Sequence, residues 1–198
     1  TVGGTTTINS TITTSSSGGV TFANGGLLTL NGNIAADGAV TQNGAGLVTI
    51  NTDRTITTTA DAVSFATDVT LARNGGTGLL TIDTTSGNAA GNNITFSAKL
   101  DGSTSGAEPV TLNAGTGGNV LFTQAVGSGT RLGAINITNA NDVTESAGIT
   151  AASLTQAAGQ GTTTFNGAVN TNTATGVNLT GNKQTVNNAI TTTAGGPA

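Results

Sequence analysis

Residues that could do chemistry are scarce in this chain, because only 7% of its 198 residues are charged. The two densest segments are TDRT, which contains Asp53 and Arg54, and NDVTE, which contains Asp142 and Glu145. On a strand, Asp53 and Arg54 would point to opposite faces, so we interpret this pair as a solvated corner. Asp142 and Glu145 could bind calcium weakly, but calcium takes about six to eight oxygen ligands. The glycine-aspartate repeat of calcium-binding β-rolls is also absent, so no metal-binding residue is predicted.

A glycosidase or polysaccharide lyase would need clustered carboxylates, or a basic residue that stabilises charge on the sugar. The remaining aspartates are instead spread along the chain, which has no histidine and no tyrosine to assist them. Its aromatic residues are five phenylalanines, which the core needs. We therefore predict no enzymatic activity, no catalytic residue and no cofactor. The dispersed aspartates are Asp37, Asp61, Asp68, Asp83 and Asp101.

The composition favours strands and excludes several classes of partner. Glycine, which disfavours helices, accounts for 31 residues, and threonine and asparagine also have low helix propensity. Apolar residues alternate with Thr, Ser or Asn, which is typical of strands. Without cysteine, disulfides and thiolate metal sites are excluded. A net charge of −4 offers no basic face to nucleic acid. No apolar run approaches the ~18 residues of a membrane span, so no membrane insertion is expected.

Copies of one short strand dominate the first half of the chain. GLLTLN begins at Gly26, GLVTIN at Gly46 and GLLTID at Gly78. The first two copies extend backwards over VTFAN and VTQNG, and each residue of the first copy keeps the same spacing to its equivalent in the second. A solenoid explains such copies, because a strand stacked on its counterpart places like side chains about 4.8 Å apart in columns. The sequence therefore predicts that Leu28 and Val48 are neighbours in adjacent layers.

Further sets of similar segments support the same architecture. ITFSAKL from Ile94 matches VLFTQAV from Val120 with an offset of 26, and TTFNGAV at residues 163–169 keeps the same gap of four from Phe to the aliphatic residue. VTQ at Val40 and LTQ at Leu154 form another pair, each after two alanines. All five phenylalanines stand third in a short strand, and we predict that several share one inward column rather than each filling a local gap. They are Phe22, Phe65, Phe96, Phe122 and Phe165.

These spacings predict an all-β fold, namely a single-stranded parallel β-helix (β-solenoid) with about 20 to 25 residues per coil and about eight or nine coils. Residues 1–198 would form one continuous solenoid segment. TINSTITTS from Thr7 resembles TVNNAITTT from Thr185 with an offset of 178, which predicts a tandem-repeat unit of that length plus a short overlap. Chance similarity in a threonine-rich sequence is the competing explanation. The abrupt start on TVGG, without an initiating Met or a signal peptide, indicates a piece of a longer protein.

The segments GLLTLNGNIAADGAVTQNGAGLVTIN and SLTQAAGQGTTTFNGAVNTNTATGVNLTG resemble the repeats of very large bacterial surface proteins. These proteins are described as β-strand-repeat or filamentous-haemagglutinin-like. The resemblance covers nearly the whole chain and rests on low-complexity motifs. It implies secretion, a right-handed parallel β-helix, and a role as an adhesin or extracellular fibre. The secretion domain of such proteins is not visible here, and no functional residue is carried over, because the motifs are structural.

A solenoid without caps exposes unpaired strand edges at both ends, and such edges aggregate unless they are covered. We therefore expect a structural, non-catalytic protein, secreted or on the cell surface, that forms a fibre, stalk or adhesin. Its partners would be copies of itself and, as a further class, cell-surface or matrix carbohydrate. A donor-strand pilus subunit and an ice-binding or carbohydrate-binding solenoid remain alternatives. TIT at Thr11 and Thr55 and TTT at Thr162 suggest ice binding, but these triplets do not recur once per coil.

Overall fold

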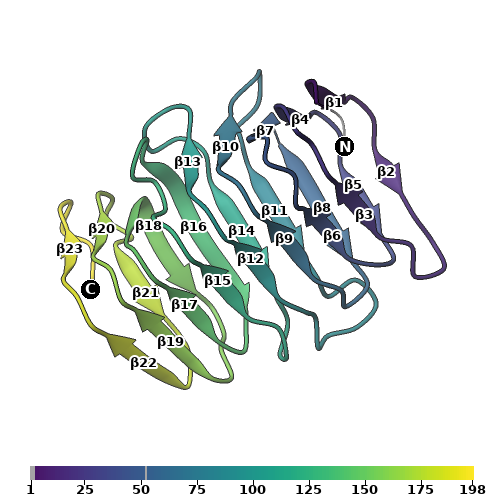
Figure 1. The fold of residues 1–198 in the computed structure, drawn as a ribbon. Coiled ribbons are helices and arrows are strands. Elements are labelled where there is room, and N and C mark those ends of the chain that lie inside the picture. The colour runs from purple at the N-terminus through teal and green to yellow at the C-terminus, as the bar shows by residue number, and fades with distance from the viewer. Residues whose placement is uncertain (1–2, 52) are drawn as a thin grey trace.

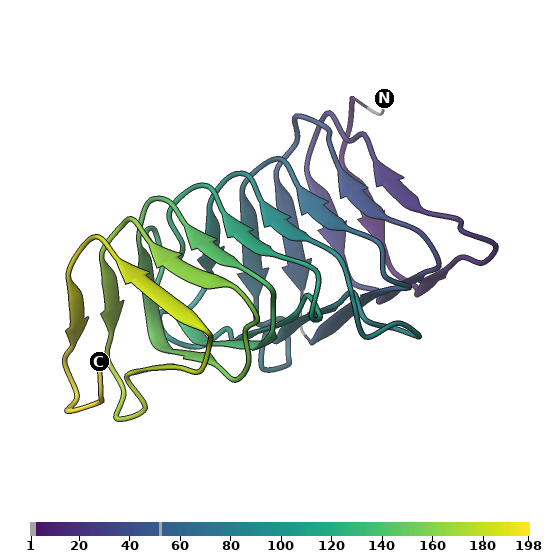
Figure 2. The same cartoon turned by 90° about the horizontal axis from the view of Figure 1, so that it is seen from below.

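The computed structural model describes residues 3–51 and 53–198, and this part of the chain contains strands but no helix. The chain winds around one axis, and successive strands belong to three faces (Figure 1). The view in Figure 2 shows the turns stacked one on another, with the two chain ends at opposite ends of the stack. One face has eight strands, which corresponds to about eight turns. The fold is therefore an all-β parallel solenoid, as the repeat spacing predicts.

Every turn contributes short strands to these three faces. The first face holds β1 (Thr6–Ile8), β4 (Leu28–Leu30), β7 (Val48–Asn51), β10 (Val69–Ala72), β13 (Leu100–Gly102), β20 (Val169–Thr171) and β23 (Ile190–Thr192). The second face holds β2 (Ile12–Thr13), β5 (Ile34–Ala36), β8 (Arg54–Thr58), β11 (Leu80–Asp83), β14 (Val110–Asn113) and β21 (Val177–Leu179). The third face holds β3 (Val20–Phe22), β6 (Val40–Gln42), β9 (Val63–Phe65), β12 (Ile94–Phe96), β15 (Val120–Phe122), β17 (Val143–Glu145), β19 (Thr162–Phe165) and β22 (Lys183–Val186).

Two longer strands, β16 (Leu132–Asn139) and β18 (Ile149–Gln156), turn the corner from the first face to the second. The first half of β18 pairs with β20 on the first face, and its second half pairs with β21 on the second face. These two strands therefore join the two faces into one hydrogen-bonded sheet.

Strands pair in parallel with their counterparts one turn away. Leu28 lies opposite Val48, as the constant spacing of the first two copies predicts. The segments that begin at Ile94 and Val120 also pair in register, which confirms the offset of 26. The inward side chains of these strands are buried in one hydrophobic cluster. Each turn therefore adds one layer to a continuous, narrow core.

Some of the similar segments do not stack on one another. In the third copy, GLLTID, Leu80 pairs with Arg54 and Val110 on the second face, whereas GLLTLN and GLVTIN lie on the first. Likewise, VTQ ends at Gln42 on the third face, and LTQ ends at Gln156 on the second. The expectation that each copy lies beside another copy is wrong for these segments. They are alike because every face requires the same alternation of inward apolar and outward polar residues.

All five phenylalanines lie in one inward column of the third face, which confirms the predicted column. Phe65, Phe96 and Phe122 stand on successive turns. Their ring centroids are 5.4 and 5.6 Å apart, with interplanar angles of 12° and 14°. Phe22 and Phe165 belong to the same column nearer its two ends. Stacked rings are favourable at this spacing, so these three rings help to hold successive turns of the third face together.

Two polar residues, Gln42 and Glu145, interrupt this column at positions equivalent to the phenylalanines. The buried Gln42 side chain donates from Nε2 to Asn24 Oδ1 (2.9 Å) and to the carbonyl oxygen of Gly44 (2.8 Å). Its Oε1 accepts a hydrogen bond from the backbone N–H of Ala66 (3.0 Å). The amide is tolerated in the core because both of its ends are paired. Through these bonds it joins the column to the corner loops of three successive turns.

Replacing Phe96 by Ala tests the column, because it removes the middle ring of the stacked three. We expect Phe96→Ala to lower the free energy of unfolding by about 3–5 kcal/mol. Thr95→Ala, on the same strand but with an outward side chain, is the matched control and should change stability by less than about 0.5 kcal/mol. Urea and thermal unfolding of both variants provide the comparison. Similar losses in the two variants would contradict a central role for the column.

Candidate functional site

Several Asp and Asn side chains at the corners bind backbone amides of the next turn. Asp68 Oδ1 accepts a hydrogen bond from the backbone N–H of Lys99 (3.0 Å). In the same way, Asn119 Oδ1 accepts from the backbone N–H of Asp142 (3.0 Å). Asp142 Oδ1 in turn accepts from the backbone N–H of Thr162 (2.7 Å). Asp68, Asn119 and Asp142 each directly precede a strand. Their side chains therefore accept hydrogen bonds from backbone N–H groups at the point where the chain of the next turn enters the sheet.

Asp53 caps a longer corner loop in the same way. Its Oδ1 accepts from Thr77 Oγ1 (2.6 Å) and from the N–H groups of Leu79 (3.0 Å) and Thr77 (3.1 Å). The Thr77 hydroxyl, and then the Leu79 amide, lower the pKa of the Asp53 carboxyl, because these bonds stabilise the charged form. Arg54 donates from Nη1 to the carbonyl oxygen of Asp53 (2.8 Å). Asp53 is exposed, as expected for a solvated corner, whereas Arg54 is half-buried, and hydrogen bonds to the next turn order the corner.

The carboxylates of Asp142 and Glu145 are directed to separate backbone amides. Glu145 is fully buried in the phenylalanine column. Its Oε1 accepts from the N–H groups of Ala147 and Gly148, and its Oε2 accepts from Gly167 (3.0 Å). Asp142 Oδ1 instead accepts the hydrogen bond from the backbone N–H of Thr162 at the corner. In the part of the chain that the structure describes, no group of three or more His, Cys, Asp or Glu residues could hold a metal ion.

A second buried carboxylate, Glu108, was not singled out in the sequence. It is fully buried in the loop between β13 and β14. Its Oε1 accepts from Ser103 Oγ (2.9 Å) and from the N–H of Thr104 (3.0 Å). Only its place in a loop with two serines, one threonine and one glycine could have indicated this role, because a compact loop must pair its own backbone amides.

The other dispersed aspartates lie on separate turns and also contact their own surroundings. Asp83 Oδ1 accepts from Thr85 Oγ1 (2.6 Å), and Asp101 Oδ1 accepts from the N–H of Gly129 (2.9 Å). Asp61 is half-buried at a corner before β9. The carboxylates are thus distributed along the rod, and their hydrogen bonds serve the fold.

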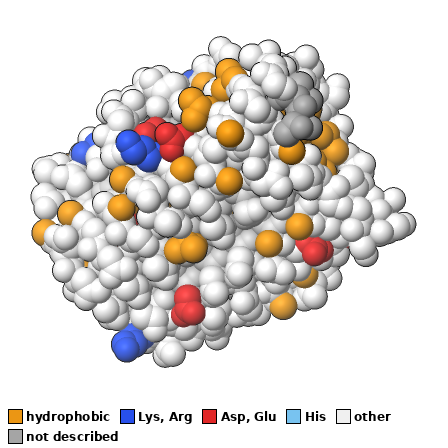
Figure 3. All heavy atoms as spheres, viewed as in Figure 1, with side chains coloured by type: hydrophobic (Ala, Val, Ile, Leu, Met, Phe, Trp, Pro, Cys, Tyr) orange, Lys and Arg blue, Asp and Glu red, His pale blue; other side chains and the backbone are white. Residues whose placement is uncertain are grey.

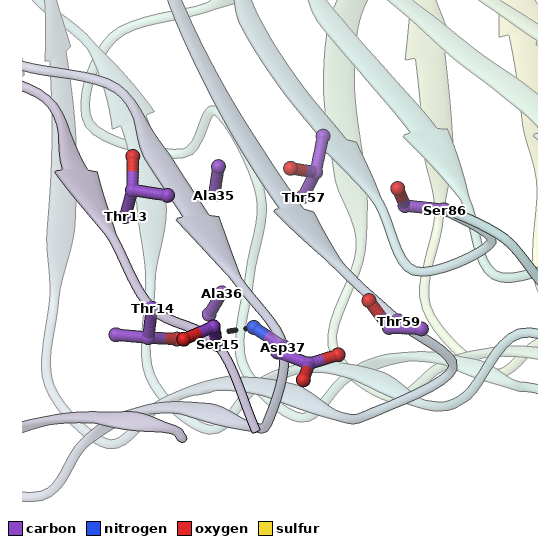
Figure 4. Close-up of a pocket in the computed structure, with 9 residues that line it drawn as sticks. All are labelled: Thr13, Thr14, Ser15, Ala35, Ala36, Asp37, Thr57, Thr59 and Ser86. Carbon is purple, nitrogen blue, oxygen red and sulfur yellow. Dashed lines mark hydrogen bonds between the residues drawn. The ribbon is translucent and has the colours of Figure 1, made fainter. Parts of the chain in front are cut away.

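A shallow groove of about 240 Å³ lies on the second face (Figure 4). Thr13, Ala35 and Thr57 stand in register on successive turns, and the small Ala35 side chain leaves a hollow between the two threonines. At the rim, the backbone N–H of Asp37 donates to Thr14 Oγ1 (3.0 Å). The lining offers hydroxyl groups and one carboxylate, which suit hydrogen bonds to a hydrated polar ligand. It has no aromatic platform and no nucleophile beside a base.

Outward hydroxyl groups form ranks along the solenoid. On the first face, Thr7, Thr29, Thr49 and Thr70 stand on successive turns. The TIT triplets are two turns apart on the second face, with Ala35 in the turn between them. On the first face single threonines thus recur on four successive turns, before Asp101 follows Thr70, although the triplets do not recur once per turn. On the third face Leu121 interrupts the hydroxyl rank, and the outward residues are Thr21, Thr41, Ser64, Thr95, Leu121, Thr144, Thr164 and Thr185.

The last turn leaves part of the core open. Val186, at the end of the phenylalanine column, is 45% exposed, and Leu179 and Ile190 are only partly buried. With Val177 they line a hollow of about 540 Å³ at this end of the solenoid. Among the described residues, no strand pairs with the outer edge of β22 or β23.

The first turn is open in a similar way. β1, β2 and β3 are the terminal strands of their faces. Ile8 and Ile12 pack against the core but are only partly buried. Within residues 3–51 and 53–198, each end of the solenoid thus presents strand edges without a partner strand and incompletely covered apolar side chains.

No family model, no curated protein and no solved structure matches this chain. Over the described residues, no helix is long and apolar enough to cross a membrane. The face in Figure 3 carries few charged side chains, and its apolar side chains are scattered rather than gathered in one patch.

Glu145→Gln tests the buried carboxylate. An amide nitrogen would face a backbone N–H in place of an oxygen, which leaves a buried donor unpaired, so we expect a loss of about 1–3 kcal/mol in stability. The half-buried Asp61 provides a control, since Asp61→Asn should change stability by less than about 0.5 kcal/mol. Urea unfolding measures both variants. If Glu145→Gln is as stable as the wild type, its backbone bonds are not important for the fold.

Asp53 predicts one contribution to the pH dependence of stability. Its pKa is lower in the folded chain, so its stabilising effect is present above the ordinary aspartate pKa of 3.8 and is lost as the pH falls through the folded value. The difference in Tm between the wild type and Asp53→Asn should therefore be larger at pH 7 than at strongly acidic pH. The comparison cancels the carboxylates that both proteins share. A difference that stays constant with pH would contradict this role of Asp53.

Proposed function

We propose that this chain is a structural, non-catalytic element of an extracellular fibre, stalk or adhesin, and that it lengthens by stacking solenoid turns end to end. The observation that carries the proposal is the open last turn, where Val186 is 45% exposed beside partly buried Leu179 and Ile190. These side chains belong to core columns that continue through the rest of the molecule. Another turn placed on them would bury them and pair the free strand edges.

The charges near the two ends do not oppose such stacking. The first charged residue in the sequence is Asp37, and Lys183 is the only one after Glu145. Two ends with so little charge neither repel nor attract each other strongly. Association would then depend on backbone hydrogen bonds and on the burial of apolar side chains.

The location outside the cell rests on the resemblance of the sequence to bacterial surface-protein repeats. The surface agrees with that role, because it is rich in uncharged hydroxyl and amide groups and has few charged side chains (Figure 3). Copies of the same unit are the first partners that we propose. We do not propose nucleic acid or membrane lipid as partners.

Carbohydrate binding is a second candidate function, and the groove in Figure 4 is the observation that favours it. Its threonine and serine hydroxyl groups and the Asp37 carboxylate match the hydroxyl groups of a sugar. A surface or matrix polysaccharide could then lie along the outside of the rod. This activity would be compatible with stacking, because the groove lies on a face and not at an end.

Val186→Asp tests the stacking function. The carboxylate tolerates partial exposure in the single chain, but it would be buried without a partner at a junction, which costs several kcal/mol. We expect wild-type chains to form rods that lengthen with concentration, and the variant to associate at least tenfold more weakly. Analytical ultracentrifugation and negative-stain images measure the association.

Leu47→Asp is the matched control for this experiment. Leu47 is 56% exposed beside β7, which has a strand partner on both edges, so its replacement by aspartate should leave assembly unchanged. The proposal fails if wild-type chains stay single at all concentrations, or if Val186→Asp assembles as well as the control.

A further inference from the structure

The first and last turns share a corner of the same length. In the first turn, Ile8 ends β1 and Ile12 begins β2 four residues later. In the last turn, Val186 ends β22 and Ile190 begins β23, again four residues later. All four side chains have incompletely covered apolar surface. The similarity between TINSTITTS and TVNNAITTT is therefore a similarity of strands and of the corner between them.

The similarity continues into the loop that follows. Thr14 Oγ1 donates to the carbonyl oxygen of Gly18, and Thr192 Oγ1 donates to the carbonyl oxygen of Gly196 (2.7 Å). The two donors, and likewise the two acceptors, are 178 residues apart, which is the offset between TINSTITTS and TVNNAITTT. The two loops therefore share this hydrogen bond, which chance likeness in threonine-rich sequence does not require, although Ser16 has a positive φ (56°) and its equivalent Ala194 does not.

These equivalent segments nevertheless lie on different faces. β1 and β2 occupy the first and second faces, whereas β22 and β23 occupy the third and first. A second copy can therefore place its first turn on the matching last turn only if it is rotated about the axis by one face.

An asparagine ladder favours the rotated arrangement. After the first-face strands, Asn31 Nδ2 donates to Asn9 Oδ1 (2.8 Å), and Asn51 Nδ2 donates to Asn31 Oδ1 (2.9 Å). After the third-face strands, Asn187 Nδ2 donates to Asn166 Oδ1 (2.8 Å). In both ladders the later turn donates to the earlier one. With β1 on β22, Asn9 of the second copy would follow Asn187, and the two ladders would become one.

The unrotated arrangement meets an obstacle on the second face. It would place β2 of the second copy on β21, but the N–H of Val177 at the start of β21 already donates to the carbonyl oxygen of Pro197 (2.8 Å). In the rotated arrangement β2 lies on β23 instead, whose outer edge has no strand partner in the described chain. The edges that are free thus match the rotated copy.

We infer that copies of this chain stack head to tail with a rotation of one face, so that β1 of one copy pairs with β22 of another and β2 pairs with β23. This inference rests on the proposed stacking function and adds its register. Ile8 would cover Val186, and Ile12 would cover Ile190. Outside, Thr7 of one copy lies directly over Thr185 of the other. Each added copy turns the hydroxyl ranks and the groove onto the next face of the fibre.

Paired cysteines distinguish the two registers, because the chain has no cysteine of its own. One protein carries Thr7→Cys and Thr185→Cys, which are neighbours only in the rotated register. The other carries Thr21→Cys and Thr185→Cys, which are neighbours only in the unrotated one, since both lie on the third face. Stacked residues of adjacent strands are about 4.8 Å apart, within the Cα range of disulfides. The single-cysteine variants measure background oxidation.

Oxidation should convert the first double variant into a ladder of covalent oligomers on a non-reducing gel, while the second yields only background dimers. Efficient cross-linking of the second double variant would overturn the rotated register and leave stacking intact. Rods in negative stain without cross-links in either pair would also overturn this register. Absence of both rods and cross-links would refute stacking itself. Circular dichroism checks that the outward substitutions leave the fold unchanged.

Discussion

Parallel pairing of each turn with the next is the interaction on which this molecule depends. Its strands are mostly three or four residues long, and strands of that length are not stable alone. Stability comes from the ladder along the axis and from the columns of like side chains that the ladder creates. The stacked rings of Phe65, Phe96 and Phe122 show how closely one layer determines the next. The same dependence leaves both ends incomplete, because each end layer lacks one neighbour.

The few charged and amide side chains mainly serve the corners, where the backbone leaves the ladder. Asp68 and Asn119 pair the N–H group at the start of the next turn, and the buried Glu145 binds three backbone amides inside the core. A narrow solenoid has little room for loops to pair themselves, so side chains supply the missing acceptors. Carboxylates that serve the backbone in this way are not gathered into a reactive cluster. This use of the charged residues agrees with the structural role that we propose.

Local regularity explains which parts of the fold were predictable. The neighbours Leu28 and Val48 and the column of phenylalanines followed from constant spacing, because turns of similar length return a residue to the same face. The face occupied by Leu80 was not predictable, since the turn from Val69 to Leu100 is longer than the turn from Leu28 to Val48. Strands visit the three faces in the same order whatever the length of the corners, so a longer corner loop changes the spacing in the sequence at which a face recurs and not the order of the faces. The buried acid Glu108 was missed for a related reason, because its partners lie within such a loop.

The sequence by itself determined the all-β class, the parallel stacking and the identity of the core columns, since alternation and spacing reflect interactions between a residue and its equivalent one turn away. The tandem-repeat unit that relates the segments from Thr7 and Thr185 stays a prediction from the sequence. Only the tertiary structure decided which face each segment occupies and which polar groups lie inside. It also showed that these two segments have corners of the same length and a matching hydrogen bond, although they lie on different faces. The physical reason is that the residue number at which each face recurs depends on the summed length of all preceding corners, whereas strand pattern is local.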